Sequence, residues 1–168
     1  MLERERKYRL AGPDIARLEQ TLGRLATLER RETQDTVHFA DGSKRTPGLN
    51  IRLRATGARQ ELTLKGPRLE GGRSKVRVEH TVAVDGDIAP ILAALGLVPT
   101  ERYRKRTAIY AFEGAVVSLD DVEGVGRFCE IEAADDATIE RAATQLGLSD
   151  EALERRGYAR LVRSADSE

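Results

Sequence analysis

The stretch Glu3-Arg4-Glu5-Arg6-Lys7 is the part of this 168-residue chain from which its fold can be argued. Successive side chains of a β-strand point to opposite faces, so Glu3, Glu5 and Lys7 share one face if the stretch is extended. Two carboxylates and one ammonium group within roughly 13 Å of strand suit a metal ion that carries an anion. A charged alternating strand is more commonly an edge strand facing water, so the stretch needs support from the rest of the chain.

The composition is that of one globular domain without net charge. Lys and Arg (28) balance Asp and Glu (28), and 40% of the residues are hydrophobic. We expect a single domain over residues 1–163 and a flexible tail at 164–168. The charge balance gives no indication of a nucleic-acid or membrane partner, and no apolar run approaches the ~20 residues that span a bilayer. A single cysteine and a charged start without an apolar signal segment favour a cytoplasmic protein.

Several further segments alternate apolar and charged residues with the period of a β-strand. Strands are predicted over residues 2–10, 28–39, 49–54, 61–65, 74–84, 98–112, 116–120 and 128–132. Amphipathic helices are predicted after Pro13, over residues 88–95 and 139–146, and over residues 153–162. The pattern therefore indicates an antiparallel, β-rich chain with peripheral helices.

Acidic residues collect on the first strand and the last pair of strands, whereas basic residues collect on the middle strands. If the helices cover the apolar side of the sheet, the charged faces look inward, and about eight strands can close into a barrel. We therefore predict an α+β fold, an eight-stranded antiparallel β-barrel with helices packed outside. The alternative is an open antiparallel sheet whose charged face is simply wet.

Such a barrel would concentrate charge in its lumen. The acids are Glu3, Glu5, Glu79, Asp120, Glu130 and Glu132, and the bases are Lys7, Arg52, Arg54, Lys65, Arg77 and Lys105 or Arg106. Burying so many charges is costly unless metal ions and an anionic ligand compensate them. Carboxylates are hard ligands for Mg²⁺ or Mn²⁺, and Arg and Lys donate to phosphate oxygens. The pattern predicts a metal-bound triphosphate.

Taken together, these motifs resemble the CYTH proteins, the triphosphate tunnel metalloenzymes that include class IV adenylate cyclases and thiamine triphosphatases. The opening E-x-E-x-K run is followed, in the family's order, by Asn50-Ile51-Arg52-Leu53-Arg54, Leu62-Thr63-Leu64-Lys65, Arg77-Val78-Glu79, Leu119-Asp120 and Glu130-Ile131-Glu132. The resemblance implies an eight-stranded triphosphate tunnel whose acids hold two Mg²⁺ or Mn²⁺ ions.

The resemblance also implies a role for each site residue. The implied metal ligands are Glu3, Glu5, Asp120, Glu130 and Glu132. The implied triphosphate contacts are Lys7, Arg52, Arg54, Lys65, Arg77, Lys105 and Arg106, with the register of residues 104–106 left open. Catalytic roles fall to Lys7, Lys65, Glu79 and Asp120, and the general base is not decided between the two carboxylates. His38 stands where the family often has tyrosine, and we expect it to be structural.

The turn at residues 124–128 and the closing residues 157–161 most resemble the class IV adenylate cyclase branch, which converts ATP to cyclic AMP and pyrophosphate. One alternative is a triphosphatase acting on inorganic triphosphate, thiamine triphosphate or a nucleoside triphosphate. Another is a non-catalytic module that binds polyphosphate or nucleotide. Each implies a small triphosphate molecule as the partner, and homodimerisation is left open.

Overall fold

The computed structural model describes residues 1–41, 49–69 and 72–165, and within these ranges the chain forms eight β-strands and four α-helices. The strands are β1 (Leu2–Leu10), β2 (Thr27–Asp41), β3 (Asn50–Thr56), β4 (Arg59–Lys65), β5 (Lys75–Val84), β6 (Leu97–Phe112), β7 (Ala115–Val122) and β8 (Gly126–Glu132). The helices are α1 (Gly12–Leu25), α2 (Ala89–Ala94), α3 (Asp136–Gln145) and α4 (Tyr158–Ala165), and a 3₁₀ turn covers Asp150–Ala152.

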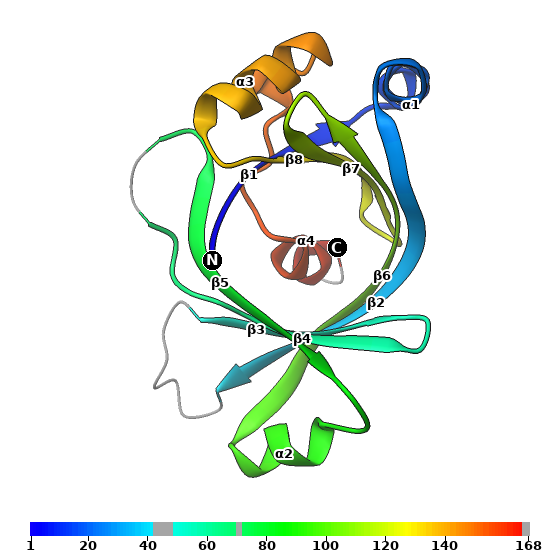
Figure 1. The fold of residues 1–168 in the computed structure, drawn as a ribbon. Helices are drawn as coiled ribbons and strands as arrows, with labels where there is room; N and C mark the ends of the chain where they lie inside the picture. Colours follow the sequence, from blue (N-terminus) through cyan, green and yellow to red (C-terminus); the bar gives the residue numbers. More distant parts are fainter. Residues whose placement is uncertain (42–48, 70–71, 166–168) are drawn as a thin grey trace.

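The eight strands close into one antiparallel barrel in the order β1-β5-β4-β3-β2-β6-β7-β8 (Figure 1). The first strand closes the barrel, because β1 pairs with β5 along one edge and with β8 along the other. Strands β3 and β4 form the predicted hairpin, whose turn contains Gly57 at a positive φ of 59°, a conformation that favours glycine. The predicted α+β fold class, an eight-stranded antiparallel barrel, is confirmed.

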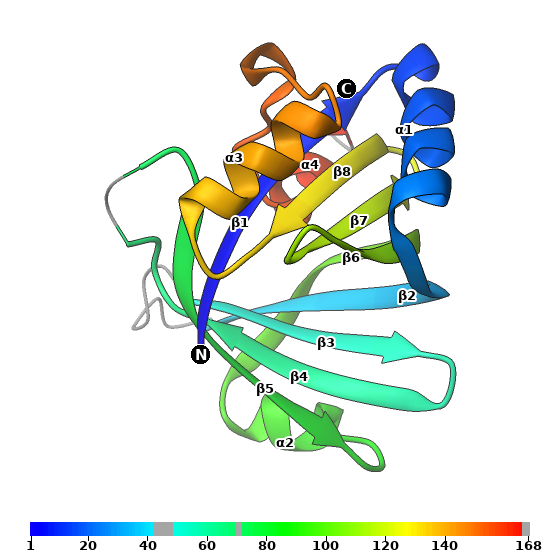
Figure 2. The same ribbon diagram turned by 45° about the horizontal axis from the view of Figure 1, so that its top comes forward.

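Helices α1 and α3 lie against the outside of the barrel, α3 next to β1, β7 and β8 and α1 next to β2 and β6 (Figure 2). Leu18 and Leu22 of α1 and Ile139 of α3 are fully buried there, in one cluster with Val117 and Ile131 from the strands. Each fully buried aliphatic side chain contributes roughly 1.5–3 kcal/mol to stability, so this outer layer is the main hydrophobic core. The alternate residues of the same strands consequently point into the barrel.

Polar contacts also fix α3 on the barrel wall. Asp135 caps the helix by accepting a hydrogen bond from the backbone N–H of Thr138 at 2.8 Å. On β1, the outward Arg6 is buried and donates to Glu140 at 2.5 Å and to Ser74 at 3.0 Å. The outward face of β1 is therefore tied to α3, while its inward face carries the acids.

The segment before the last helix differs from its prediction. We predicted a helix over residues 153–162, but Leu153 instead forms a β-bridge with Tyr8, and the Glu154 N–H donates to the Lys7 carbonyl at 2.7 Å. The helix starts only after Gly157, a residue that destabilises a helix interior. Residues 153–157 thus follow the first strand and lead the chain back to the barrel.

Helix α4 lies at one end of the barrel and, in Figure 1, within the ring of strands. Tyr158, Leu161 and Val162 of α4 form a second buried cluster with residues that include Tyr103 and Phe128 from the wall. The helices α1 and α3 lie outside as predicted, whereas α4 closes an end. This cluster is separate from the outer core.

The end of the chain was predicted to be a flexible tail from residue 164. Helix α4 runs through Ala165, so the first two residues of that tail are helical, and residues 166–168 lie outside the described part. Across the described residues, none of the helices combines the length and apolar character needed to cross a membrane.

Candidate active site

The inward side chains of the barrel line a cavity of about 730 Å³. The predicted site residues that line it are Glu3, Glu5, Lys7, Arg52, Arg54, Lys65, Arg77, Glu79, Lys105, Glu130 and Glu132. They come from six strands and share the cavity because alternate residues of every strand point to the interior. The structure therefore brings together most of the residues that the motifs had indicated.

The acids of β1 and β8 form one wall of the cavity, the acidic wall: Glu3, Glu5, Glu130 and Glu132. Within this wall, the pKa of Glu3 is strongly shifted. Its side chain is in contact with the Lys65 ammonium group and lies 3.2 Å from Arg77 Nη2. Only 6% of the residue is exposed, and burial, followed by the negative charge of Glu5, raises the pKa of Glu3 to about 7. The wall thus holds a carboxyl group that can take up or release a proton near neutral pH.

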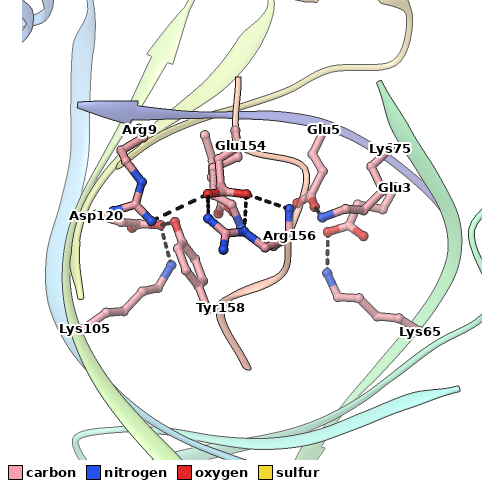
Figure 3. Close-up of polar contacts among 12 residues, drawn as sticks. Glu3, Glu5, Arg9, Lys65, Lys75, Lys105, Asp120, Glu154, Arg156 and Tyr158 are labelled. Atoms are coloured by element: carbon pink, nitrogen blue, oxygen red, sulfur yellow. Dashed lines mark hydrogen bonds and ion pairs between the residues drawn. The ribbon is translucent and has the colours of Figure 1, made fainter. Parts of the chain in front are cut away.

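Glu5 is paired with a lysine that our sequence analysis did not assign to the site. Lys75 Nζ donates to Glu5 Oε1 at 2.6 Å, as Figure 3 shows. Burial opposes ionisation of Glu5, but the charges of Lys75 and Lys65 outweigh it and lower the pKa. A signal for Lys75 was present in the sequence, because it precedes Arg77 by two positions and so shares its face of β5.

Arg52 and Arg54 of β3 are the centre of a second, basic wall of the cavity. Arg52 Nη2 lies 3.8 Å from Glu79 Oε1, and the same carboxylate accepts from Lys65 Nζ at 2.8 Å. Arg54 forms no ion pair among the residues that the structure describes, and burial, followed by the charge of Arg52, lowers its pKa. Positive charge is therefore in excess on this side of the cavity, which suits an anion.

Asp120 is held by two hydrogen-bond donors from other elements. It is 2% exposed, and its Oδ2 accepts from Lys105 Nζ at 2.8 Å and from the Tyr158 hydroxyl at 2.7 Å (Figure 3). On β7 it lies opposite Phe128, two residues along β8 from Glu130. Burial opposes its ionisation, but Lys105 outweighs burial and lowers the Asp120 pKa. The structure therefore pairs this predicted metal ligand with an ammonium group and a hydroxyl rather than with another acid.

Tyr158 is a site residue that sequence reasoning missed as an individual contact. The centroid of its ring lies 3.9 Å from Lys7 Nζ, close enough for a cation–π interaction. The same ammonium group lies 3.7 Å from Glu130 Oε1, and burial lowers the pKa of Lys7. Helix α4 therefore supplies both a hydrogen bond and an aromatic face to the end of the cavity where Tyr158 lies, which we call the inner end.

Arg106 is not part of the cavity, and its predicted contact with a triphosphate is corrected. Its side chain is 68% exposed on the outer face of β6 and lies 3.9 Å from Asp121. Lys105 is the inward residue of this strand and is buried. The physical reason is the two-residue period of the strand, which sends neighbouring side chains to opposite faces.

The donor chemistry of the acidic wall fits a divalent cation. Glu5 lies directly opposite Glu132, and two residues further along β1, Lys7 lies opposite Glu130. Like charges placed directly across a sheet destabilise it, and carboxylate oxygens are the ligands that Mg²⁺ and Mn²⁺ prefer. Within the described ranges, no group of three His, Cys, Asp or Glu residues is already close enough to hold a metal ion. The residue types fit, while several of the carboxylates now contact lysine or arginine.

Comparison with known proteins gives one consistent family. The profile of the CYTH domain matches residues 1–158. A curated protein from Methanocaldococcus jannaschii, named "Putative adenylate cyclase MJ0240", is 31% identical over 107 residues, a match that spans 61% of this chain and only 61% of that relative. Among solved structures, the PH1819 protein from Pyrococcus horikoshii has a TM-score of 0.77 at 26% identity and covers 99% of both chains.

A more distant structure has the same fold. HpAC1 from Hippeastrum, described as having a dominant triphosphatase activity, has a TM-score of 0.72 at 17% identity, and the match covers 97% of this chain and 95% of HpAC1. At that identity the likeness concerns the fold alone.

Proposed function

This chain belongs to the CYTH domain family, and on that premise we propose that it is a metal-dependent enzyme which holds a triphosphate-bearing substrate inside its barrel. The observation that supports the proposal best is the pair Arg52 and Arg54, of which Arg54 has no ion-pair partner in the described part of the chain. Guanidinium groups match phosphate oxygens in geometry and charge. An anion between the two walls would compensate that excess of positive charge.

Further cations would bind the rest of the triphosphate chain. Lys65 and Arg77 lie between the two walls and contact Glu3, and Lys7 and Lys105 lie at the inner end near Tyr158. A polyphosphate carries several negative charges along its length, so cations at successive depths of the barrel fix its position. In this proposal Lys7 and Lys65 also stabilise negative charge that develops during the reaction.

The proposed cofactor is Mg²⁺ or Mn²⁺ at two sites. Glu3, Glu5, Glu130 and Glu132 would hold these ions, because their carboxylates share the acidic wall and include a directly opposed pair. The ions would supply Lewis-acid neutralisation of phosphate oxygens when bound. Asp120 would serve instead to position Lys105 and Tyr158, to which it is hydrogen-bonded.

The first reaction we propose is that of a class IV adenylate cyclase, in which the 3′-oxygen of ATP attacks the α-phosphorus and pyrophosphate leaves. The protein positions the chain and stabilises charge, as is usual for phosphoryl transfer. A carboxylate must accept the proton of the 3′-hydroxyl. Glu79 would take this role, because it lines the cavity beside Arg52, whereas Asp120 is engaged by two donors.

Hydrolysis of the terminal phosphate is the second candidate. Glu132 and Val116 are directly paired on β8 and β7, line the cavity and are exposed, so water reaches the acidic wall at this mouth. A water molecule oriented there would attack the γ-phosphorus and release orthophosphate. The two reactions differ in which phosphorus atom lies against the acidic wall.

Product analysis tests the proposal. The protein would be incubated separately with ATP, tripolyphosphate and thiamine triphosphate, each with Mg²⁺, with Mn²⁺ and with EDTA. Cyclic AMP with pyrophosphate identifies the cyclase, whereas orthophosphate with the corresponding diphosphate, and no cyclic AMP, identifies the triphosphatase; EDTA should abolish either. Binding that survives EDTA without turnover of any substrate would support the non-catalytic polyphosphate- or nucleotide-binding module and contradict the enzyme.

A further inference from the structure

The barrel cavity shares part of its lining with a second cavity. The second cavity has a volume of about 950 Å³ and is lined by residues of α4 and of the strands β2, β3, β5 and β6. His38, Asn50, Lys75 and Arg77 line both cavities. A molecule whose triphosphate lies in the barrel could therefore extend past these residues into a space large enough for a small organic group.

His38 lies at this junction, and one of its ring nitrogens is unpaired within the described part of the chain. The residue is 7% exposed, and its ring stacks on Tyr103 with the centroids 5.8 Å apart. The side-chain nitrogen of Asn50 lies 3.2 Å from His38 Nδ1, whereas the buried Nε2 has no hydrogen-bond partner among the residues that the structure describes. An amide nitrogen donates, so Nδ1 is the acceptor and Nε2 carries the hydrogen. A buried donor without an acceptor costs stability, so this group fits a ligand atom.

The surroundings keep His38 uncharged. Burial, followed by the positive charge of Arg52, lowers the pKa of His38 to about 4. The junction thus combines a neutral donor with cations from the neighbouring strand β3, Arg52 and Arg54. Arginines can neutralise phosphate, while a neutral imidazole N–H and an amide recognise uncharged acceptors.

We propose that His38 and Asn50 bind the part of the substrate that extends beyond the triphosphate, and that this part is the nucleoside of a nucleotide. Ribose oxygens and base nitrogens are neutral acceptors of the kind that the His38 N–H requires. A thiazolium ring would bring a positive charge next to Lys75, Arg77 and Arg160, and inorganic triphosphate has no group for the second cavity. This inference rests on the proposed function, because it requires the triphosphate to lie in the barrel.

The matched variants His38→Phe and His38→Gln test the proposal. Phenylalanine keeps a ring for stacking on Tyr103 but has no N–H, whereas the glutamine amide keeps a neutral donor. Dissociation constants would be measured calorimetrically with Mg²⁺ for α,β-methylene-ATP and for tripolyphosphate. We expect His38→Phe to weaken binding of the nucleotide about tenfold and His38→Gln about threefold at most, with tripolyphosphate changed less than about twofold.

Asn50→Ala provides a second test, because Asn50 is only half-buried and its truncation leaves the His38 ring in place. Asn50→Ala should likewise weaken binding of the nucleotide and leave binding of tripolyphosphate unchanged. Equal losses for both ligands, or an unchanged nucleotide affinity in His38→Phe and Asn50→Ala, would overturn the inference while leaving the triphosphate site intact. Failure of the unmodified protein to bind either ligand would instead contradict the proposed function, and the inference with it.

Discussion

At the scale of single residues, the charged side chains of the cavity differ in whether they already have an ion-pair partner. Glu3, Glu5 and Asp120 each contact at least one lysine. Arg54 lacks such a partner within the described residues, although it lies in the same cavity. Arg54 is therefore the residue whose removal should affect an anionic ligand most and the protein alone least.

Arg54→Ala is predicted to weaken tripolyphosphate binding by about 10- to 100-fold, the loss expected for charge-assisted hydrogen bonds. The free energy of unfolding should change by less than about 1 kcal/mol, because Arg54 has no ion pair to lose among the described residues. Isothermal titration calorimetry and urea unfolding measure the two quantities. Arg106→Ala is the matched control, since its outward guanidinium should leave binding unchanged; equal effects of the two variants would count against the tunnel assignment.

His38 makes stability depend on pH in a defined direction. Its pKa of about 4 in the folded protein lies below the ordinary value of 6.5, so the unfolded chain binds the proton first as the pH falls. The contribution of His38 to the free energy of unfolding is fully present above pH 6.5. It is lost between pH 6.5 and 4, by at most roughly 3 kcal/mol.

The difference in unfolding free energy between the unmodified protein and His38→Gln isolates this contribution. The unmodified protein should lose stability relative to the variant as the pH is lowered from 7 to 4.5 in urea titrations. Parallel pH curves for the two proteins would show that His38 titrates normally.

At the scale of elements, α4 is the helix that most affects the site. Its lead-in segment follows β1, and Tyr158 then places a hydroxyl on Asp120 and a ring beside Lys7. The helix thereby links the last strands, the first strand and the inner end of the cavity. The contribution of Tyr158 to stability can be divided between its hydroxyl and its ring.

Tyr158→Phe should cost about 1–3 kcal/mol of stability, since it removes one buried hydrogen bond to a carboxylate. Tyr158→Leu should cost more, roughly 3–5 kcal/mol, because the aromatic packing and the cation–π contact are lost as well. Urea unfolding monitored by circular dichroism gives both values. If the two variants are equally stable, the ring contributes nothing beyond the hydroxyl, contrary to the contacts described.

The strands could be predicted from the sequence more completely than α4. The alternation of apolar and charged residues correctly assigned Arg52 and Lys65 to the inner face of the barrel. Arg52 lies between two apolar residues of the opposite face, and Lys65 follows one. Around Lys105 the neighbours are basic on both sides, so alternation left the register open. The structure resolves it, because Tyr110, on the same face of β6 as Arg104 and Arg106, lies in the outer core. Helical periodicity shows that α4 has an apolar face but not which surface that face covers, and so Tyr158 could not be placed.

At the scale of the whole molecule, a chain without net charge separates its charges inside the barrel. Acids from β1 and β8 form one wall, and the arginines of β3 contribute to the other. The outer core under α1 and α3 stabilises the strands that carry the acids, so the wall does not depend on a ligand for its fold. The barrel therefore holds two walls of opposite charge at a fixed separation, which suits a metal-bound triphosphate.

A crystal structure with Mg²⁺ and α,β-methylene-ATP tests this account most directly. We predict that the triphosphate lies inside the barrel in contact with Arg52, Arg54 and Lys65, that Mg²⁺ lies on the Glu5 and Glu130 side, and that the adenosine reaches His38. A nucleotide bound on the outer surface, or one inside the barrel whose phosphates do not contact the two arginines, would contradict the account.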